Sequence, residues 1–139
     1  MDIKIRFANT EDLDACVELD LHKNIEIILN KIIMNEVIVC EFEKNIIGCL
    51  KIEYFWTHLP FISYIVVKDS FRTFGIGSKL LSFLEIHLKE KGCTTLLSST
   101  MTDAIVPQRW HMKKGFKECG MLCGINDHGI GEIFFKKAL

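Results

Sequence analysis

The first third of the chain predicts a strand followed by two helices. Ile3–Ala8 alternates apolar and polar residues, which is typical of a short strand. Asn9 and, three residues later, Asp12 resemble a capping box, which predicts a helix extending to Leu21. A second, more apolar helix is expected over Asn24–Met34.

The next segment is rich in β-branched residues and predicts three strands. Glu36–Glu43 and Asn45–Trp56 have this composition, and a tight turn at Lys44 and Asn45 would join them as a hairpin. Phe61–Lys68 follows with the same composition. Three consecutive strands with short connections predict an antiparallel meander.

A clear helical period follows the meander. The polar residues between its apolar positions make Gly75–Lys91 an amphipathic helix, and Gly92 is placed to end it. The apolar positions recur every four residues, at Ile76, Leu80, Leu84 and Leu88.

The last third completes a mixed sheet. A strand, a helix and a strand of similar length predict a right-handed crossover, so that Phe61–Lys68 and Thr94–Ser99 become parallel neighbours. The expected fold class is therefore α/β, with an antiparallel meander, a parallel βαβ pair and a C-terminal hairpin in one domain over residues 1–139. The remaining expected elements are a helix over Asp103–Lys114, stopped by Gly115, and strands over Phe116–Ile125 and Gly131–Lys137.

Composition and charge exclude several classes of partner. The 139 residues are 49% hydrophobic, which suits one domain, and no apolar run approaches the ~18 residues that span a membrane. Seventeen basic and eighteen acidic residues give a net charge of -1, which lacks the basic footprint of a nucleic-acid binder. We therefore expect a cytoplasmic protein with a small-molecule or peptide substrate, and the sequence leaves a homodimer open.

The six cysteines do not form a recognisable site. No two of them have CxxC spacing, so neither a zinc site nor a redox motif is predicted. Most lie in apolar runs, and we expect buried free thiols and no metal. The cysteines are Cys16, Cys40, Cys49, Cys93, Cys119 and Cys123.

The stretch FRTFGIGSKL contains two glycines where a strand gives way to a helix. Each glycine costs a helix about 1 kcal/mol relative to alanine, so Gly75 and Gly77 need an offsetting reason. One reason is an anion held by the free N–H groups of the first helical turn, and the other is close packing of the helix on a strand. A nucleotide loop of the Walker type is absent, and a dinucleotide fingerprint would need glycine at Leu80.

Three segments resemble the GNAT superfamily of N-acetyltransferases. YIVVKDSFRTFGIGSKLLSFLE is similar to its acyl-coenzyme A signature, in which Arg72, Gly75 and Gly77 meet the pattern [RQ]-x-x-G-x-[GA]. IRFANTEDLDACVEL resembles the family's first strand and helix, and QRWHMKKGF resembles its late helix before a Gly-Phe step. The resemblance covers nearly the whole chain in the family's order.

This resemblance implies that acetyl-coenzyme A is the cosubstrate. Backbone N–H groups of the glycine loop would hold the pyrophosphate, and the pantetheine arm would lie along the fourth strand like an added strand. Phe74 departs from the family, where a basic residue is common, so one charge near the phosphates is missing. The implied cofactor residues are Ile65, Val66 and Val67 on the strand and Arg72, Thr73, Phe74, Gly75, Ile76, Gly77 and Ser78 in the loop.

The implied reaction is direct transfer of an acetyl group to an amine. His111 stands where the family often has the tyrosine that protonates the departing thiolate, although a packed structural histidine is an equal interpretation. Glu53 is the candidate base, with Tyr64 and a water relay as alternatives. The acceptor pocket would involve Leu21–Lys31 and Ile125–Gly131, which leaves the acceptor amine open. An acyl-coenzyme A sensor without catalysis is the alternative function.

Overall fold

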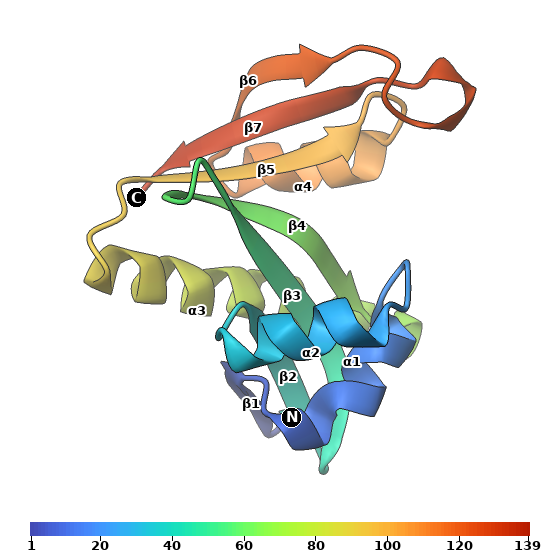
Figure 1. Ribbon diagram of the computed structural model, residues 1–139, viewed down its shortest axis with the longest axis vertical. Coiled ribbons are helices and arrows are strands. Elements are labelled where there is room, and N and C mark those ends of the chain that lie inside the picture. Colours follow the sequence, from blue (N-terminus) through green and yellow to red (C-terminus); the bar gives the residue numbers. More distant parts are fainter.

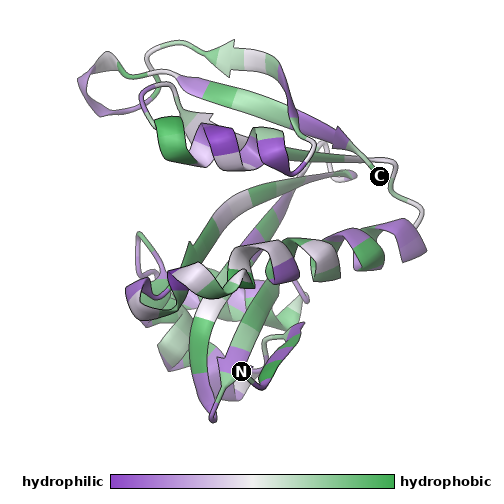
Figure 2. Cartoon of the chain, turned by 180° about the vertical axis from the view of Figure 1, so that it is seen from behind, coloured by the Kyte–Doolittle hydropathy of each residue, from purple (hydrophilic) through white to green (hydrophobic).

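A computed structural model describes residues 1–139, and its centre is one seven-stranded sheet. Helices α1 and α2 cover one face of this sheet, and α3 and α4 cover the other (Figures 1 and 2). The strand order is β1-β2-β3-β4-β5-β7-β6. In chain order the strands are β1 (Ile3–Phe7), β2 (Val37–Phe42), β3 (Asn45–Phe55), β4 (Leu59–Val67), β5 (Thr95–Met101), β6 (Lys117–Leu122) and β7 (Glu132–Ala138). The helices are α1 (Leu13–Leu19), α2 (Ile25–Ile33), α3 (Ile76–Glu90) and α4 (Ile105–Lys113), with short 3₁₀ helices at Thr10–Asp12, Asp69–Phe74 and Asp127–Gly129.

The parallel pair of β4 and β5 is confirmed, and it is short. The two strands pair only where Phe61 lies opposite Leu97 and Ile62 opposite Ser98. Beyond this point they diverge, so the sheet opens between its β1–β4 half and its β5–β7–β6 half (Figure 1). The register of β4 against β3 also shifts, which leaves Ser63 as a bulge at the start of the divergence. The sheet is thus split next to an irregular strand.

Helix α3 forms the larger core, as its four-residue period predicts. The side chains on its inner face are at most 2% exposed and pack with strands β2 to β4. A second core lies on the opposite face, where α1 and α2 pack against β2. Strand β2 is therefore buried on both faces, and Val37–Cys40 is fully buried. The inner face of α3 consists of Ile76, Leu80, Leu81, Leu84 and Leu88.

Several predicted boundaries differ from the structure by one to three residues, and two of them change a turn or a helix end. The turn between β2 and β3 is Glu43–Lys44, because Phe42 already pairs with Asn45. Both turn residues have positive φ, 48° and 66°. Glycine or asparagine usually occupies such positions, so Glu43 and Lys44 carry no clear turn signal. The first helix ends at Leu19, and Leu21 lies 69% exposed beyond it.

The expectation of buried thiols holds for only part of the set. Cys16, Cys40 and Cys49 are buried, whereas Cys119 and Cys123 are exposed, and all six cysteines are free. The exposed pair lies on or next to β6, an edge strand whose residues are all exposed. No helix has the length and apolar character needed to cross a membrane.

Candidate active site

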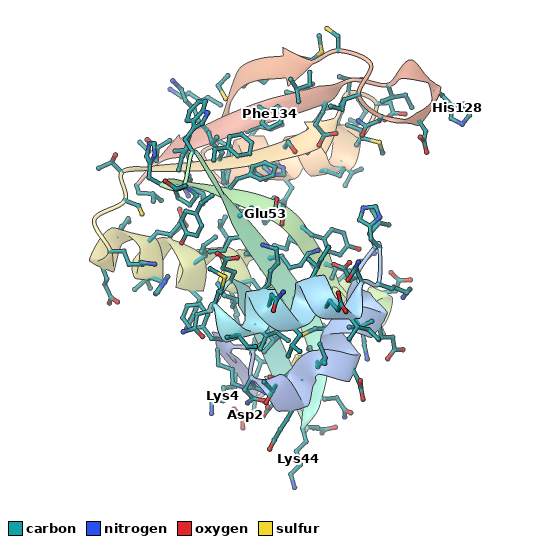
Figure 3. The ribbon with its side chains drawn as sticks, viewed as in Figure 1. Asp2, Lys4, Lys44, Glu53, His128 and Phe134 are labelled. Carbon is teal, nitrogen blue, oxygen red and sulfur yellow. The ribbon has the colours of Figure 1, made fainter.

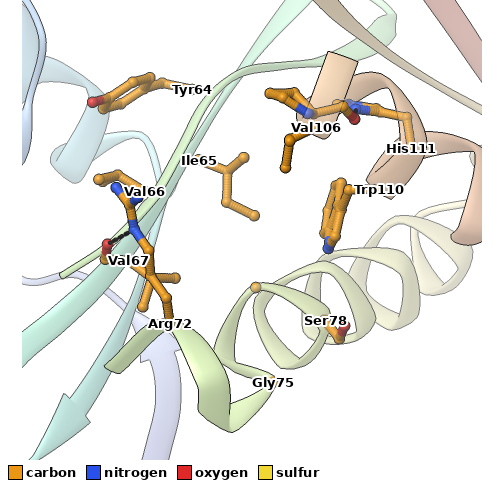
Figure 4. Close-up of a pocket in the computed structure, with 12 residues that line it drawn as sticks. Tyr64, Ile65, Val66, Val67, Arg72, Gly75, Ser78, Val106, Trp110 and His111 are labelled. Carbon is orange, nitrogen blue, oxygen red and sulfur yellow. Dashed lines mark hydrogen bonds between the residues drawn. The ribbon is translucent and has the colours of Figure 1, made fainter. Parts of the chain in front are cut away.

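A cleft of about 510 Å³ lies between β4, the N-terminus of α3 and helix α4 (Figure 4). We call it the outer cleft. It occupies the face of the sheet that carries α3 and α4, where the divergence of β4 from β5 leaves β4 uncovered. Its lining consists of Tyr64–Val67 from β4, Arg72, Gly75, Gly77 and Ser78 from the glycine loop, and Val106, Pro107, Trp110 and His111 from α4.

The two glycines of the loop serve different purposes. Gly75 adopts a left-handed conformation, with φ of 71°, at the residue that precedes α3, and this conformation favours glycine. Gly77 lies in the first turn, and a Cβ there would sit 3.7 Å from the Trp110 ring. Helix geometry leaves the N–H groups of Ile76, Gly77 and Ser78 without intrahelical partners. The loop therefore presents unshielded backbone donors to the outer cleft.

The side chains of the predicted cofactor loop divide into two groups. Arg72 stays at the rim, where its guanidinium lies 2.9 Å from Asp69 and its Nε donates to the carbonyl of Val67 at 3.3 Å (Figure 4). Phe74 is half exposed, and Ile76 points into the core with 1% exposure. The predicted residues that line the outer cleft are Ile65, Val66, Val67, Arg72, Gly75, Gly77 and Ser78, and those that do not are Thr73, Phe74 and Ile76.

His111 lies in the wall of the outer cleft and is 4% exposed. Its Nδ1 is 2.7 Å from the carbonyl oxygen of Pro107, which can only accept, so Nδ1 carries the proton of the neutral ring. Nε2 then accepts from the hydroxyl of Ser98 at 2.7 Å. The ring stacks on Phe135, and its burial lowers the pKa of His111 below the usual 6.5. Both ring nitrogens are therefore engaged in a neutral imidazole.

A second hollow of about 290 Å³, the inner cleft, continues from the outer one. The two hollows share Tyr64, Ile65, Pro107 and His111. The inner cleft adds polar side chains from the bulge of β4, the end of β5 and the start of β7: Ser63, Ser98, Ser99, Thr100 and Glu132. One passage thus runs from the first turn of α3 to the C-terminal end of β5.

Glu53 lies outside both hollows. Its side chain is 51% exposed on the face that carries α1 and α2, and it lies 3.7 Å from the ammonium of Lys31. The structure does not bring Glu53 and His111 together in one cleft. Tyr64 lines both hollows instead, and burial raises the pKa of its hydroxyl.

Several lining residues were not found from the sequence. Ser98 and Pro107 hold the His111 ring, and Trp110 closes the outer cleft over Gly77. A serine pair inside the apolar strand TLLSSTM is a usable signal for Ser98. Glu132 gave no signal, because its place depends on the pairing of β7 with β5.

The family relationship follows from the sequence of this central region. The sequence model described as acetyltransferase (GNAT) domain matches residues 34–118, more than half of the chain. The chain belongs to the GNAT acetyltransferases. The GNAT match runs from the end of α2 to the start of β6 and contains the outer cleft, whereas Glu132 lies beyond it.

Solved structures of GNAT proteins share the fold over the whole chain. An N-acetyltransferase from Staphylococcus aureus Mu50 superimposes with a TM-score of 0.86 at 22% identity, covering 99% of each chain. A ribosomal-protein-alanine N-acetyltransferase from Brucella melitensis gives 0.83 at 23% identity, covering 98% of this chain and 99% of its own. The PaiA N-acetyltransferase from Thermoplasma acidophilum, solved in complex with coenzyme A, gives 0.82 at 18% identity and covers all of both chains. No curated protein matches the sequence.

Proposed function

We propose that the protein transfers an acetyl group from acetyl-coenzyme A directly to an amine. The observation that carries this proposal is the passage through the sheet. It has free backbone N–H donors at one end and, at the other, the Glu132 carboxylate, which forms no ion pair. A coenzyme A complex of a protein with the same fold supports the donor. Membership of the GNAT acetyltransferases supports acetyl transfer as the class of reaction.

The outer cleft suits the phosphates and the pantetheine arm. The N–H groups of the first turn of α3, together with the positive end of its dipole, would hold the pyrophosphate. Gly77 would let the phosphate approach the backbone, and Arg72 would add charge at the rim. The uncovered edge of β4 at Ile65–Val67 would bind the pantetheine amides as an added strand.

The reaction itself requires little covalent chemistry from the protein. The acceptor reaches the thioester through the inner cleft and reacts as the neutral amine, after its ammonium has lost a proton to a base or to water. The nitrogen then forms the C–N bond and loses its second proton, the C–S bond breaks, and the departing thiolate takes up a proton, so that an amide and free coenzyme A are formed. Binding both reactants in one passage supplies much of the rate through proximity. Tyr64 and Ile65 line the region where both reactants would meet.

His111 remains the candidate donor for the proton that the thiolate takes up. In the neutral ring Nε2 has no proton to give, because Nδ1 carries it toward Pro107. Donation at Nε2 would require the imidazolium, which burial disfavours. Water is therefore the competing donor, and Glu53 remains a candidate base that acts from outside the cleft.

Selective binding of acetyl-coenzyme A is the first test. A ligand at 100 times its Kd stabilises the native state by about 2.7 kcal/mol, which a melting curve detects. We expect a raised Tm with acetyl-coenzyme A and little change with ATP or NAD at the same concentration. An equal rise with all three would indicate a general anion site and contradict the proposed donor.

Turnover is the second test. A panel of amines with acetyl-coenzyme A should release free thiol, which is measured continuously with a thiol reagent. Binding of acetyl-coenzyme A without thiol release from any amine would instead favour a sensing module without catalysis.

A further inference from the structure

The carboxylates near the passage differ in whether a cation neutralises them. Asp20, in the loop after α1, pairs with Lys51, and Glu53 has Lys31 at 3.7 Å. Glu132 at the start of β7 takes part in no ion pair. The inner cleft, which Glu132 lines, therefore contains a carboxylate whose charge no side chain of the protein balances.

Two neutral donors hold the Glu132 carboxylate. The hydroxyl of Ser99 donates to Oε2 at 2.6 Å, and the amide of Asn126 donates to Oε1 at 2.9 Å. Both bonds leave the charge in place while fixing the side chain. Each carboxylate oxygen has a second lone pair, so Glu132 can still accept bonds from a cation in the cleft.

The loop that carries Asn126 is closed on itself. The Asn126 N–H donates to the carbonyl of Ile130 at 3.0 Å, and the N–H of Thr102 donates to the carbonyl of Gly131 at 2.9 Å. A Cβ at Gly131 would lie 3.2 Å from the Thr102 methyl group, so glycine allows this close approach. The loop is thereby attached to the end of β5, which fixes Glu132 at the cleft.

Glu132 also lies on the face of the sheet opposite the proposed cofactor loop. It is two residues before Phe134 on β7, so the two side chains share a face. Figure 3 shows Phe134 on the same side as Glu53, where α1 and α2 lie. The acceptor would therefore approach from the α1 and α2 side, and its amine would meet Glu132 before the thioester.

We propose that Glu132 is the residue that selects a positively charged acceptor. The carboxylate would bind the ammonium of an alkyl primary amine, such as a peptide N-terminus or an aliphatic amine, and discriminate against amines that are uncharged at neutral pH. Charge-assisted hydrogen bonds in a partly buried site are the stronger class, which gives this contact its selectivity. The assignment rests on the proposed acetyl transfer.

The test compares Glu132→Gln with the wild type on two acceptors. A short peptide with a free α-amino group is mostly charged below its pKa of about 8, whereas aniline is uncharged at pH 7. We expect kcat/KM for the peptide to fall about 10- to 100-fold, mainly through KM, and kcat/KM for aniline to change less than about threefold. Glutamine preserves the size of the side chain and an oxygen for Ser99, so the fold and the Tm rise with acetyl-coenzyme A should persist.

The pH profile separates charge recognition from a structural role. The penalty of Glu132→Gln on the peptide should be largest near pH 6.5 and should fade above about pH 9, where the α-amino group is neutral. The matched control is Glu118→Gln, which removes an exposed carboxylate on β6 that lines neither cleft. It should leave the ratio of peptide to aniline turnover unchanged.

Each outcome decides one assignment. Equal loss with peptide and aniline, or no loss with either, would overturn the role of Glu132 while acetyl transfer stands. A wild type that binds acetyl-coenzyme A and releases thiol with neither acceptor, nor with the wider amine panel, would overturn both the transferase function and this inference.

Discussion

The two ends of the passage are built from different parts of the polypeptide. The outer cleft presents backbone: the first turn of α3 and the free edge of β4, with Arg72 at the rim as its charged side chain. The inner cleft and its surroundings present side chains from separate segments, including Ser99, Glu132 and the nearby Lys51–Asp20 pair. A site made of backbone groups depends on the fold and on a few glycines. A site made of charged side chains also depends on the residues that hydrogen-bond to or neutralise each charge.

The largest effect is expected on the side-chain end, from Lys51→Met. Asp20 has a 4% exposed side chain. Burial opposes its ionisation, but the Lys51 ammonium and the N–H groups of His22 and Lys23 outweigh burial and lower its pKa. Removing the ammonium leaves a buried charge, which should lower the free energy of unfolding by about 3–5 kcal/mol in urea denaturation. The double variant Asp20→Asn/Lys51→Met should recover most of this loss, and a loss below about 1 kcal/mol in the single variant would contradict the expected dependence on pairing.

On the backbone end, Gly77→Val should separate binding from stability. The side chain would fill the space over the first-turn N–H groups, and we expect acetyl-coenzyme A to bind about 100-fold more weakly, a loss of about 2.7 kcal/mol. The fold should lose only about 1 kcal/mol, because valine is tolerated in a helix. Titration calorimetry and urea denaturation measure the two quantities.

The matched control for Gly77 is Gly92→Ala. Gly92 has φ of 84° just beyond α3, with no atom within 4 Å of a Cβ there, and it lies outside both hollows. Alanine at positive φ should cost about 1 kcal/mol of stability and leave the affinity for acetyl-coenzyme A unchanged. A Gly77→Val protein that keeps wild-type affinity would move the phosphates away from this loop.

His111 connects the two ends, and His111→Phe should change the pH dependence of stability. Its pKa in the folded protein is lower than the unfolded value of about 6.5, so the unfolded chain binds more protons as the pH falls. The wild type should therefore lose stability below about pH 6.5, by roughly 1 kcal/mol per pH unit until the folded ring protonates. The variant should lack this component, and identical pH profiles would show that the ring titrates normally.

The same variant tests the catalytic role of His111. Loss of a true proton donor should lower kcat by about 100-fold or more, with little change in affinity for acetyl-coenzyme A. A decrease of only a few-fold would favour water as the donor and leave His111 as part of the cleft wall.

The smallest effect is expected from Phe74→Lys, which gives the backbone end a second charged side chain. Phe74 is half exposed next to the first turn of α3, so a lysine there can reach a bound phosphate without disturbing the core. Affinity for acetyl-coenzyme A should rise about threefold at low salt and return to the wild-type value near 1 M salt, because screening removes surface attractions. Phe74→Leu, which adds no charge, should show no such salt dependence.

The sequence predicted the backbone end better than the side-chain end for a physical reason. The glycine loop and the leucines of α3 are local signals, because conformation and helical period are set by neighbours in the chain. Glu132 became visible only through the pairing of β7 with β5, which brings it to Ser99 across 33 residues. The turn at Glu43–Lys44 was missed because its positive φ values fall on residues that rarely adopt them.

Because of the bulge at Ser63, the arrangement of β4 depends more on the number of its residues than on the identity of its side chains. Phe61 lies opposite Glu53 and Tyr64 opposite Lys51, so both side chains face α1 and α2 although three residues separate them. Deleting Ser63 would restore strict alternation and leave Phe61 and Tyr64 on the same face, but it would remove the bulge at which β4 begins to diverge from β5. Without the bulge, the opening that leaves the edge of β4 free for pantetheine would narrow. Insertions and deletions in this strand are therefore far less tolerable than substitutions, and related chains should preserve its residue count where they vary its side chains.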